Sequence, residues 1–156
     1  MIEVIKSGLY TSIQDKGRFG YENYGVPISG SMDQFSSILS NKLLNNAEDD
    51  AVMEITMTGP ILKFHKKTKI CITGADISPT LNMKPINLNT SHLINKDDIL
   101  SFGKLKYGLR SYLSVSGGFL SKIVMGSRSM YSNITKSSRI TKGEFLKIDP
   151  IKNLNK

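Results

Sequence analysis

The chain carries the stretch Gly8-Leu-Tyr-Thr-Ser-Ile-Gln-Asp-Lys-Gly-Arg-Phe-Gly20, followed closely by Gly25-Val-Pro-Ile-Ser-Gly-Ser-Met-Asp33. Gln14, Asp15 and Arg18 place an amide, a carboxylate and a guanidinium within one short turn-rich segment. Tight turns are permitted there by Gly17, Gly20, Gly25 and Gly30. Ordering such a segment costs conformational entropy, so it is typical of a long connection or of a functional loop.

This stretch opens a series of motifs that runs along nearly the whole chain. The series comprises Thr11-Ser-Ile-Gln-Asp-Lys-Gly-Arg18, Gly25-Val-Pro-Ile-Ser-Gly-Ser-Met-Asp33, Ser40-Asn-Lys-Leu43, Met53-Glu-Ile-Thr-Met-Thr-Gly-Pro60, Ile72-Thr-Gly-Ala-Asp76, Gly108-Leu-Arg-Ser-Tyr-Leu-Ser-Val-Ser-Gly-Gly118 and Met125-Gly-Ser-Arg-Ser129. In this order the motifs resemble the bacterial carboxyltransferase-like family that includes the C subunit of 5-oxoprolinase, the KipI antagonist and allophanate hydrolase subunit 2.

The resemblance implies a cyclophilin-like β-barrel and a protein of two halves, of which this chain matches the first. Residues 1–148 are then one domain, and residues 149–156 are a tail or the start of a missing second half. The match is loosest from about Tyr131 onward, where Asn133-Ile-Thr-Lys-Ser-Ser138 replaces a glycine-rich stretch of the family.

The implied function is that of a subunit, or half a subunit, of an ATP-dependent 5-oxoprolinase, which opens 5-oxoproline to glutamate. Its partners would be the other 5-oxoprolinase subunits, of which one is KipI-like, and ATP would be used by the complex. One alternative is a biotin-dependent carboxyltransferase, or a protein like allophanate hydrolase, that acts on a urea-like amide with biotin on a partner. Another is a regulatory binding protein like the KipI antagonist. If either enzyme hypothesis holds, we expect the isolated chain to be inactive.

Composition sets further limits on the function. The 156 residues suffice for one domain with its own core, and the net charge of +8 invites a nucleic-acid interpretation. The basic residues are scattered, however, with the densest cluster at residues 63–69, and no nucleic-acid motif is present. We therefore expect no nucleic-acid partner. No signal peptide or membrane span is indicated, so a cytoplasmic location is expected.

Cofactor motifs are also missing from these 156 residues. Neither a phosphate-binding loop nor a dinucleotide fingerprint occurs. Cys71, His65 and His92 lie too far apart in sequence to indicate a zinc site, so no metal is predicted. Cys71 has apolar neighbours and is interpreted as a buried side chain rather than a nucleophile.

Short β-rich segments dominate the pattern, which predicts a mainly-β barrel with one main helix. Expected strands cover residues 2–5, 9–13, 51–57, 69–73, 98–102, 109–115 and 145–148, with a tight hairpin at residues 81–86. The helix is expected near residues 33–45, where Phe35, Ile38, Leu39 and Leu43 recur at helical spacing. Residues 126–131 suggest a short helical turn.

Several polar side chains are candidates for a site, each with a structural alternative. Asp15 and Arg18 form either a loop-holding ion pair or a site in which Arg18 grips an anion. Asp33 either caps the helix or takes part in catalysis. Glu54 is either a buried general acid or base or a solvated side chain.

The remaining candidates point to anion binding. Ser29 and Gly30 precede the expected helix, where backbone amides form an anion site. Arg110 and Tyr112 share one face of a strand, where they meet an acidic, planar substrate or simply cover a barrel wall. Ser127 and Arg128 lie in a turn that either binds an anion or is solvated. Catalytic roles are assigned to Asp15, Asp33 and Glu54, and substrate binding to Gln14, Arg18, Ser29, Gly30, Arg110, Tyr112, Ser127 and Arg128.

Overall fold

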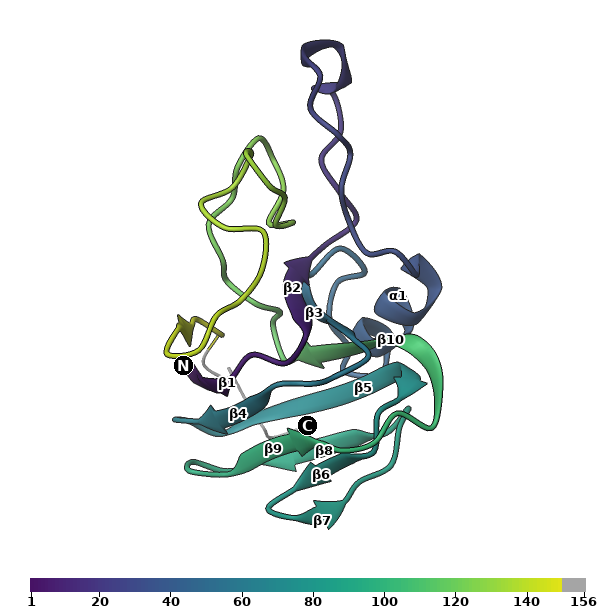
Figure 1. The fold of residues 1–156 in the computed structure, drawn as a ribbon, viewed down its shortest axis with the longest axis vertical. Coiled ribbons are helices and arrows are strands. Elements are labelled where there is room, and N and C mark those ends of the chain that lie inside the picture. The colour runs from purple at the N-terminus through teal and green to yellow at the C-terminus, as the bar shows by residue number, and fades with distance from the viewer. Residues whose placement is uncertain (150–156) are drawn as a thin grey trace.

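The computed structural model describes residues 1–149, which form eleven strands, one α-helix and one 3-10 turn (Figure 1). The strands are β1 (Ile2–Lys6), β2 (Tyr10–Gln14), β3 (Val52–Thr56), β4 (Ile61–Phe64), β5 (Thr68–Asp76), β6 (Pro79–Leu81), β7 (Lys84–Pro85), β8 (Ser91–Ile94), β9 (Ile99–Phe102), β10 (Tyr107–Val115) and β11 (Phe145–Leu146). The helix α1 spans Gln34–Lys42, and the 3-10 turn η1 spans Glu22–Tyr24.

The strands form two antiparallel sheets that enclose one core. The six-stranded sheet has the order β11-β1-β4-β9-β6-β7, and the five-stranded sheet has the order β2-β3-β10-β5-β8. In the five-stranded sheet, Ile13 pairs with Met53, which pairs with Leu113, which pairs with Ile72. Side chains at paired positions share a face, so this row points into the core. The buried cluster also contains Ile2, Val4, Leu62, Phe64, Ile94 and Leu100.

The opposite face of the five-stranded sheet carries polar side chains. Ser12 pairs with Glu54, which pairs with Tyr112, which pairs with Thr73. Helix α1 covers the β10–β5 part of this face (Figure 1). The β2–β3 part is not covered by the helix, and it positions the candidate site described below.

Helix α1 is where predicted, but it does not bury its apolar residues. Its buried residues are Ser36, Ser37, Ser40 and Asn41, whereas Phe35 is 76% exposed. The reason is that the face of the five-stranded sheet under the helix is polar. Thr73 Oγ1 donates to the Ser36 carbonyl at 2.7 Å, and Ser114 Oγ donates to the Ser40 carbonyl at 2.9 Å. Small hydroxyl residues allow the close approach that these hydrogen bonds need.

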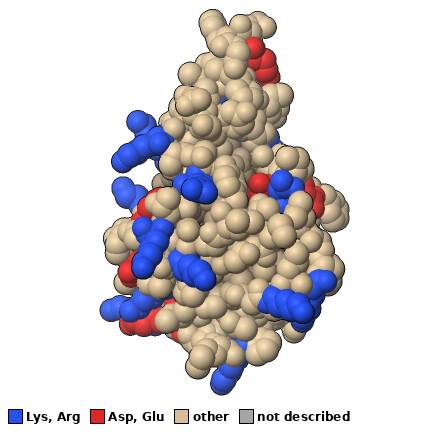
Figure 2. All heavy atoms as spheres, in the orientation of Figure 1, with Lys and Arg blue, Asp and Glu red and all other residues tan. Residues whose placement is uncertain are grey.

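Residues 16–30, here called the arm, project far from the two sheets (Figure 1). The base of the arm is tightly constrained, because a Cβ on Gly30 would lie 2.8 Å from the Lys16 carbonyl oxygen at a backbone φ of 92°. The tip turns through η1 and Gly25, which adopts the left-handed conformation. The arm carries few charges, and its upper part is almost free of blue and red side chains in Figure 2.

These observations confirm the mainly-β class with one main helix; the cyclophilin-like assignment stays a prediction. Strands β4 and β8 were not predicted, because each lies next to polar or charged residues. The helical turn expected at residues 126–131 is wrong: Val124 and Ser127 form an isolated bridge around a tight turn at Met125 and Gly126. No helix within residues 1–149 is long and apolar enough to cross a membrane. The predicted tail at residues 149–156 lies, apart from Asp149, outside the described residues.

Cys71 is fully buried, as predicted, and burial raises the pKa of its thiol from 9.0 to about 11. We expect the folded protein to react with a thiol reagent such as DTNB at pH 8 far more slowly than the urea-unfolded chain. Since the folded pKa is the higher one, the neutral thiol's contribution to stability is complete below pH 9 and is lost as the pH rises toward 11. Equal reaction rates of folded and unfolded chains would contradict this burial.

Candidate functional site

A groove of about 560 Å³ lies on the outer face of the five-stranded sheet, between the base of the arm and residues 130–138. Strand β2 supplies Tyr10, Ser12 and Gln14 to it, because alternate residues of a strand point to the same side. The other lining residues are Ser29, Gly30, Ser31, Met32, Glu54, Arg110, Met130, Tyr131, Ser132 and Ser138.

Glu54 is the acidic side chain of the groove, and it is only 8% exposed. Its Oε2 atom accepts hydrogen bonds from the Met32 backbone N–H at 2.8 Å and from the Tyr112 hydroxyl at 2.9 Å. No hydrogen bond to Oε1 is found among residues 1–149. One carboxylate oxygen is therefore fixed by the fold, while the other remains an acceptor for a ligand.

Arg110 lies beside this second oxygen, with its Nε atom 3.8 Å from Glu54 Oε1. Its side chain is 30% exposed and lines the groove. An acceptor and a planar donor thus stand side by side. An amide group presents the complementary pair, an N–H donor and a carbonyl acceptor.

Two buried polar atoms of groove residues have no hydrogen-bond partner among the described residues: Gln14 Oε1 and Ser31 Oγ. The Gln14 amide nitrogen is satisfied, donating to Ser12 Oγ at 3.0 Å and to the Met130 carbonyl at 3.1 Å. An unsatisfied buried polar atom costs free energy, which is regained when a ligand or a water molecule binds it. Gln14 Oε1 is an acceptor, whereas the Ser31 hydroxyl can accept or donate.

Tyr112 supports Glu54 from below the groove. It is fully buried, and its oxygen accepts a hydrogen bond from the Asp33 N–H at 2.8 Å while donating to Glu54. Burial, with a further contribution from the Glu54 carboxylate, raises the pKa of the Tyr112 phenol well above its usual value. The phenol therefore stays neutral and acts as a donor rather than as a base.

We expect Tyr112→Phe to lower the free energy of unfolding by about 1–3 kcal/mol, because the Asp33 N–H and Glu54 would each lose a partner. Urea denaturation followed by circular dichroism measures this change. Tyr107→Phe, at a residue 62% exposed, is the matched control and should alter stability by less than about 0.5 kcal/mol. Equal effects of the two substitutions would contradict the role given to Tyr112.

Asp15 belongs to a different cluster. Its Oδ1 accepts hydrogen bonds from the Gly17 N–H at 2.9 Å and from the hydroxyls of Ser127 and Ser129 at 2.6 and 2.7 Å. Its Oδ2 accepts from the Arg128 N–H at 2.7 Å. The turn around Ser127 therefore does bind an anion, and that anion is the carboxylate of Asp15.

Arg18 is fully buried and holds the same two segments together. Its Nε donates to the Val124 carbonyl at 2.8 Å and its Nη2 to the Ser129 carbonyl at 2.9 Å, and its Nη1 donates to Ser29 Oγ at 3.2 Å. The ion pair between Asp15 and Arg18, one of the two alternatives given for them, is not formed, since each binds residues 124–129 instead. The guanidinium of Arg128 likewise donates to the Ser121 carbonyl.

The predicted site residues thus separate into groups. Gln14, Ser29, Gly30, Glu54 and Arg110 line the groove, and Tyr112 lies beneath it. Asp33 caps helix α1, accepting from the Ser36 N–H at 3.0 Å. Asp15, Arg18, Ser127 and Arg128 form the neighbouring cluster. Of the amides expected to form an anion site, that of Ser31 instead donates to the Asp15 carbonyl at 3.0 Å, and the adjacent Met32 N–H donates to Glu54. Catalytic and substrate-binding roles remain predictions for all these residues.

Sequence reasoning missed seven residues of the groove: Tyr10, Ser12, Met32, Met130, Tyr131, Ser132 and Ser138. The alternation of Tyr10, Ser12 and Gln14 was a usable signal, because it puts three polar side chains on one face of a strand. The contribution of residues 131–138 had no such signal, since it depends on how a long loop packs.

Comparison with known proteins adds to this geometry. The profile of the carboxyltransferase domain, subdomain A and B, matches residues 24–155. The chain belongs to this carboxyltransferase family. It is 41% identical over 131 residues to a urea amidolyase of Lachancea kluyveri, covering 83% of this chain and 7% of that protein. It is 33% identical over 120 residues to the C subunit of the Haemophilus influenzae 5-oxoprolinase, covering 77% of this chain and 39% of that protein.

A solved structure has the same fold. The crystal structure of the K. lactis urea amidolyase superposes with a TM-score of 0.89 at 40% identity, over 93% of this chain and 9% of that chain. The carboxyltransferase-family chain thus spans well under half the length of these relatives. The activities of these whole relatives are therefore proposals for this protein.

Proposed function

We propose that this chain forms the amide-binding part of a carboxyltransferase-type enzyme, and that the amide is urea-like. The observation that carries the proposal is Glu54, which lines the groove with its Oε2 held by two hydrogen bonds and its Oε1 3.8 Å from Arg110 Nε. Support also comes from the relatives of about 40% identity that are named for urea chemistry.

Each residue of the groove has its own role in holding the amide. Arg110 donates to the carbonyl oxygen of the amide, and Glu54 Oε1 accepts one of its N–H groups. Gln14 Oε1 and Ser31 Oγ are buried and without a partner among the described residues, so a shift of either side chain toward the groove would let it bind a further N–H group of a urea-like amide. When the amide nitrogen becomes a nucleophile it must lose a proton, and Glu54 is placed to take it.

In this proposal the carboxyl group is delivered by a partner and not by this chain. These 156 residues contain no lysine in an Ala/Val-Met-Lys-Met context, so biotin would arrive on a partner. ATP would be used by another part of the complex. The cytoplasmic location expected from the sequence stays a prediction.

The proposal is tested with the chain assembled with its companion subunits. Urea-dependent consumption of a carboxylated biotin carrier is the expected result, and the isolated chain should show none. Consumption that does not depend on any amide would contradict the proposal.

A second candidate is the 5-oxoprolinase role, favoured by the relative of that name. Its substrate is a cyclic amide with a carboxylate, which Arg110 also suits. Release of glutamate from 5-oxoproline by the assembled complex, without carboxylation of urea, would favour this candidate over the first.

Partner dependence is supported by the exposed apolar residues of the arm and the start of α1. Phe19 is 61% exposed, Tyr24 is 82% exposed and Met32 is 69% exposed. We propose that the arm packs against a companion protein or domain, because exposed apolar clusters commonly mark interfaces.

The arm leads to a direct prediction. Tyr24→Ser should weaken the complex about tenfold or more in a co-purification or calorimetry experiment, as aromatic residues at interface centres often do. Its thermal stability should stay that of the wild type, because Tyr24 packs against little of its own chain. Met83→Ser, 92% exposed on the far hairpin, is the matched control. Equal complex formation by both variants would remove the arm from the interface.

A further inference from the structure

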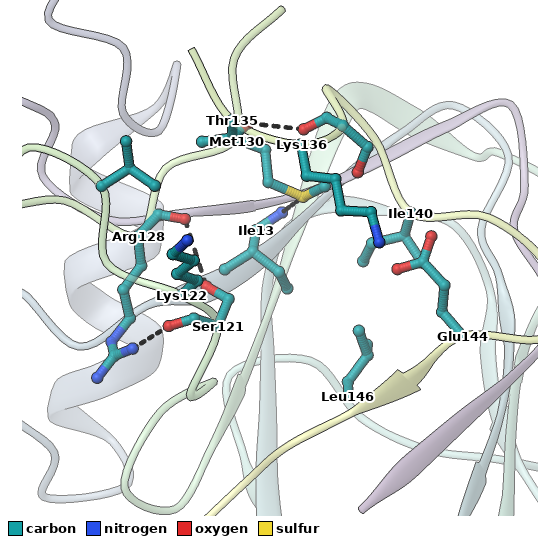
Figure 3. A pocket seen from close by; sticks show the side chains of 12 residues that line it. Ile13, Ser121, Lys122, Arg128, Met130, Thr135, Lys136, Ile140, Glu144 and Leu146 are labelled. Carbon is teal, nitrogen blue, oxygen red and sulfur yellow. Dashed lines mark hydrogen bonds between the residues drawn. The ribbon is translucent and has the colours of Figure 1, made fainter.

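A second pocket, of about 150 Å³, is drawn in Figure 3. It is lined by Ile13, which points to the opposite side of β2 from Ser12 and Gln14 of the groove. It forms because β2 is an edge strand of the five-stranded sheet, and only two backbone–backbone hydrogen bonds join residues 130–140 to it within the described part of the chain. The Met130 N–H donates to the Ile13 carbonyl at 2.9 Å, and the Ile140 N–H donates to the Thr11 carbonyl at 2.7 Å. The loop between these points bows outward and leaves a hollow next to the core.

The wall of this pocket is apolar. Ile13 and Ile140 belong to the buried core, and Val124, Met130 and Leu146 are the other apolar residues that line it. The volume is similar to that of cavities of roughly 150 Å³ that bind benzene. A ligand with one small ring or a short aliphatic chain therefore fits it.

Charged side chains surround the mouth of the pocket, and positive charges outnumber negative ones (Figure 3). Lys136 and Glu144 point toward each other on one side, while Lys122 and Arg128 lie on the other. The Glu144 carboxylate accepts from the N–H and the hydroxyl of Thr141 at 2.8 and 2.6 Å. Three cations and one anion give the rim a net charge of +2, and no acidic partner of Lys122 is found within residues 1–149.

We propose that this pocket binds a small carboxylate with an apolar body, of the size of benzoate. The ring or chain displaces water from Ile13, Val124 and Leu146, and the carboxylate lies toward Lys122. Apolar burial supplies most of the affinity, and the rim charge selects an anion over a neutral or cationic ligand of the same shape. This site goes beyond the amide-binding role proposed for the groove.

The pocket and the groove share one residue, Met130, which lines both. Its sulfur accepts from the Ile13 N–H at 3.2 Å, and its carbonyl accepts from the Gln14 side-chain amide at 3.1 Å. A ligand that packs on Met130 therefore contacts the residue that orients Gln14. We expect occupancy of the pocket to change amide binding in the groove, and the reverse effect to be equal because binding free energies are linked.

Calorimetric titration of the folded chain with benzoate tests the site. We expect saturable binding at millimolar concentration, weaker binding of benzyl alcohol, and none of benzylamine. Val124→Phe should fill the pocket and abolish binding. Lys122→Glu should weaken benzoate binding about threefold to fivefold, as expected for an exposed charge. Lys96→Glu makes the same charge change in the turn between β8 and β9 and should leave the affinity unchanged.

Several results would overturn the proposal. They are no saturable benzoate binding, equal binding of benzoate and benzyl alcohol, and equal effects of Lys122→Glu and Lys96→Glu. If Val124→Phe does not fold, Lys122→Glu and Lys96→Glu still test the proposal. Both lysines are exposed, so neither substitution disturbs the core. A failure of amide binding in the groove would leave these outcomes unaffected.

Discussion

Replacing Arg18 with alanine should lower the free energy of unfolding by about 3–5 kcal/mol, because three hydrogen bonds of a fully buried guanidinium are lost at once. The Ser129 carbonyl would lose its donor, the Val124 carbonyl would keep only the Ser127 N–H, and a large buried volume would be left empty. For a chain of this size the melting temperature should fall by roughly 10 °C. Differential scanning calorimetry measures the change.

Arg139 provides the control, because it is exposed. Arg139→Ala should leave the melting temperature within about 2 °C of the wild type. Arg18→Lys should recover little stability, since a single ammonium cannot reproduce the planar donors that reach three acceptors. A melting temperature of Arg18→Ala equal to that of the wild type would show that these hydrogen bonds do not stabilise the fold.

This expectation changes how Arg18 serves as a functional probe. From its sequence neighbours, Arg18 is as good a candidate for anion binding as Arg110, since each is an arginine close to a glycine in a motif of the same series. Only the packing separates them: Arg18 is enclosed by residues 124–129, more than a hundred positions away, whereas Arg110 opens onto the groove. Loss of activity in an Arg18 variant would therefore report on folding as much as on chemistry.

The elements themselves were largely predictable, because period-two alternation and turn residues are local signals. Glu54 and Tyr112 were chosen from their strands, and sheet register brings them together as a buried pair. Local signals could not show which face of helix α1 packs against the sheet. Phe35 has the spacing of a core residue, yet α1 buries serines because the sheet beneath it presents Thr73 and Ser114.

The division of the candidate residues into two clusters also depends on distant contacts. Asp15 and Gln14 are neighbours in sequence and point to opposite sides of the chain after β2 ends. Gln14 lines the groove, while Asp15 binds the serines of the turn near residue 127. The serine hydroxyls that satisfy Asp15 come from a loop whose position no local pattern indicates.

Glu54→Gln should reduce the turnover number of the assembled enzyme about a hundredfold or more while leaving the fold intact. The glutamine keeps an oxygen acceptor for the Met32 N–H and the Tyr112 hydroxyl, so the contacts that hold residue 54 are preserved. It loses the negative charge beside Arg110 and the ability to take a proton from the amide. A positioned general base contributes about 10²–10⁴ to rate.

Steady-state kinetics of the complex with a urea-like amide, together with urea denaturation of the chain, separates chemistry from folding. The free energy of unfolding of Glu54→Gln should stay within about 1 kcal/mol of the wild type. Glu48→Gln, at an exposed side chain paired with Lys16 and Lys42, is the matched control and should turn over normally. Unchanged turnover of Glu54→Gln in a folded, assembled complex would exclude Glu54 as the base. The groove would then keep at most a binding role, with Arg110 as its remaining charged group.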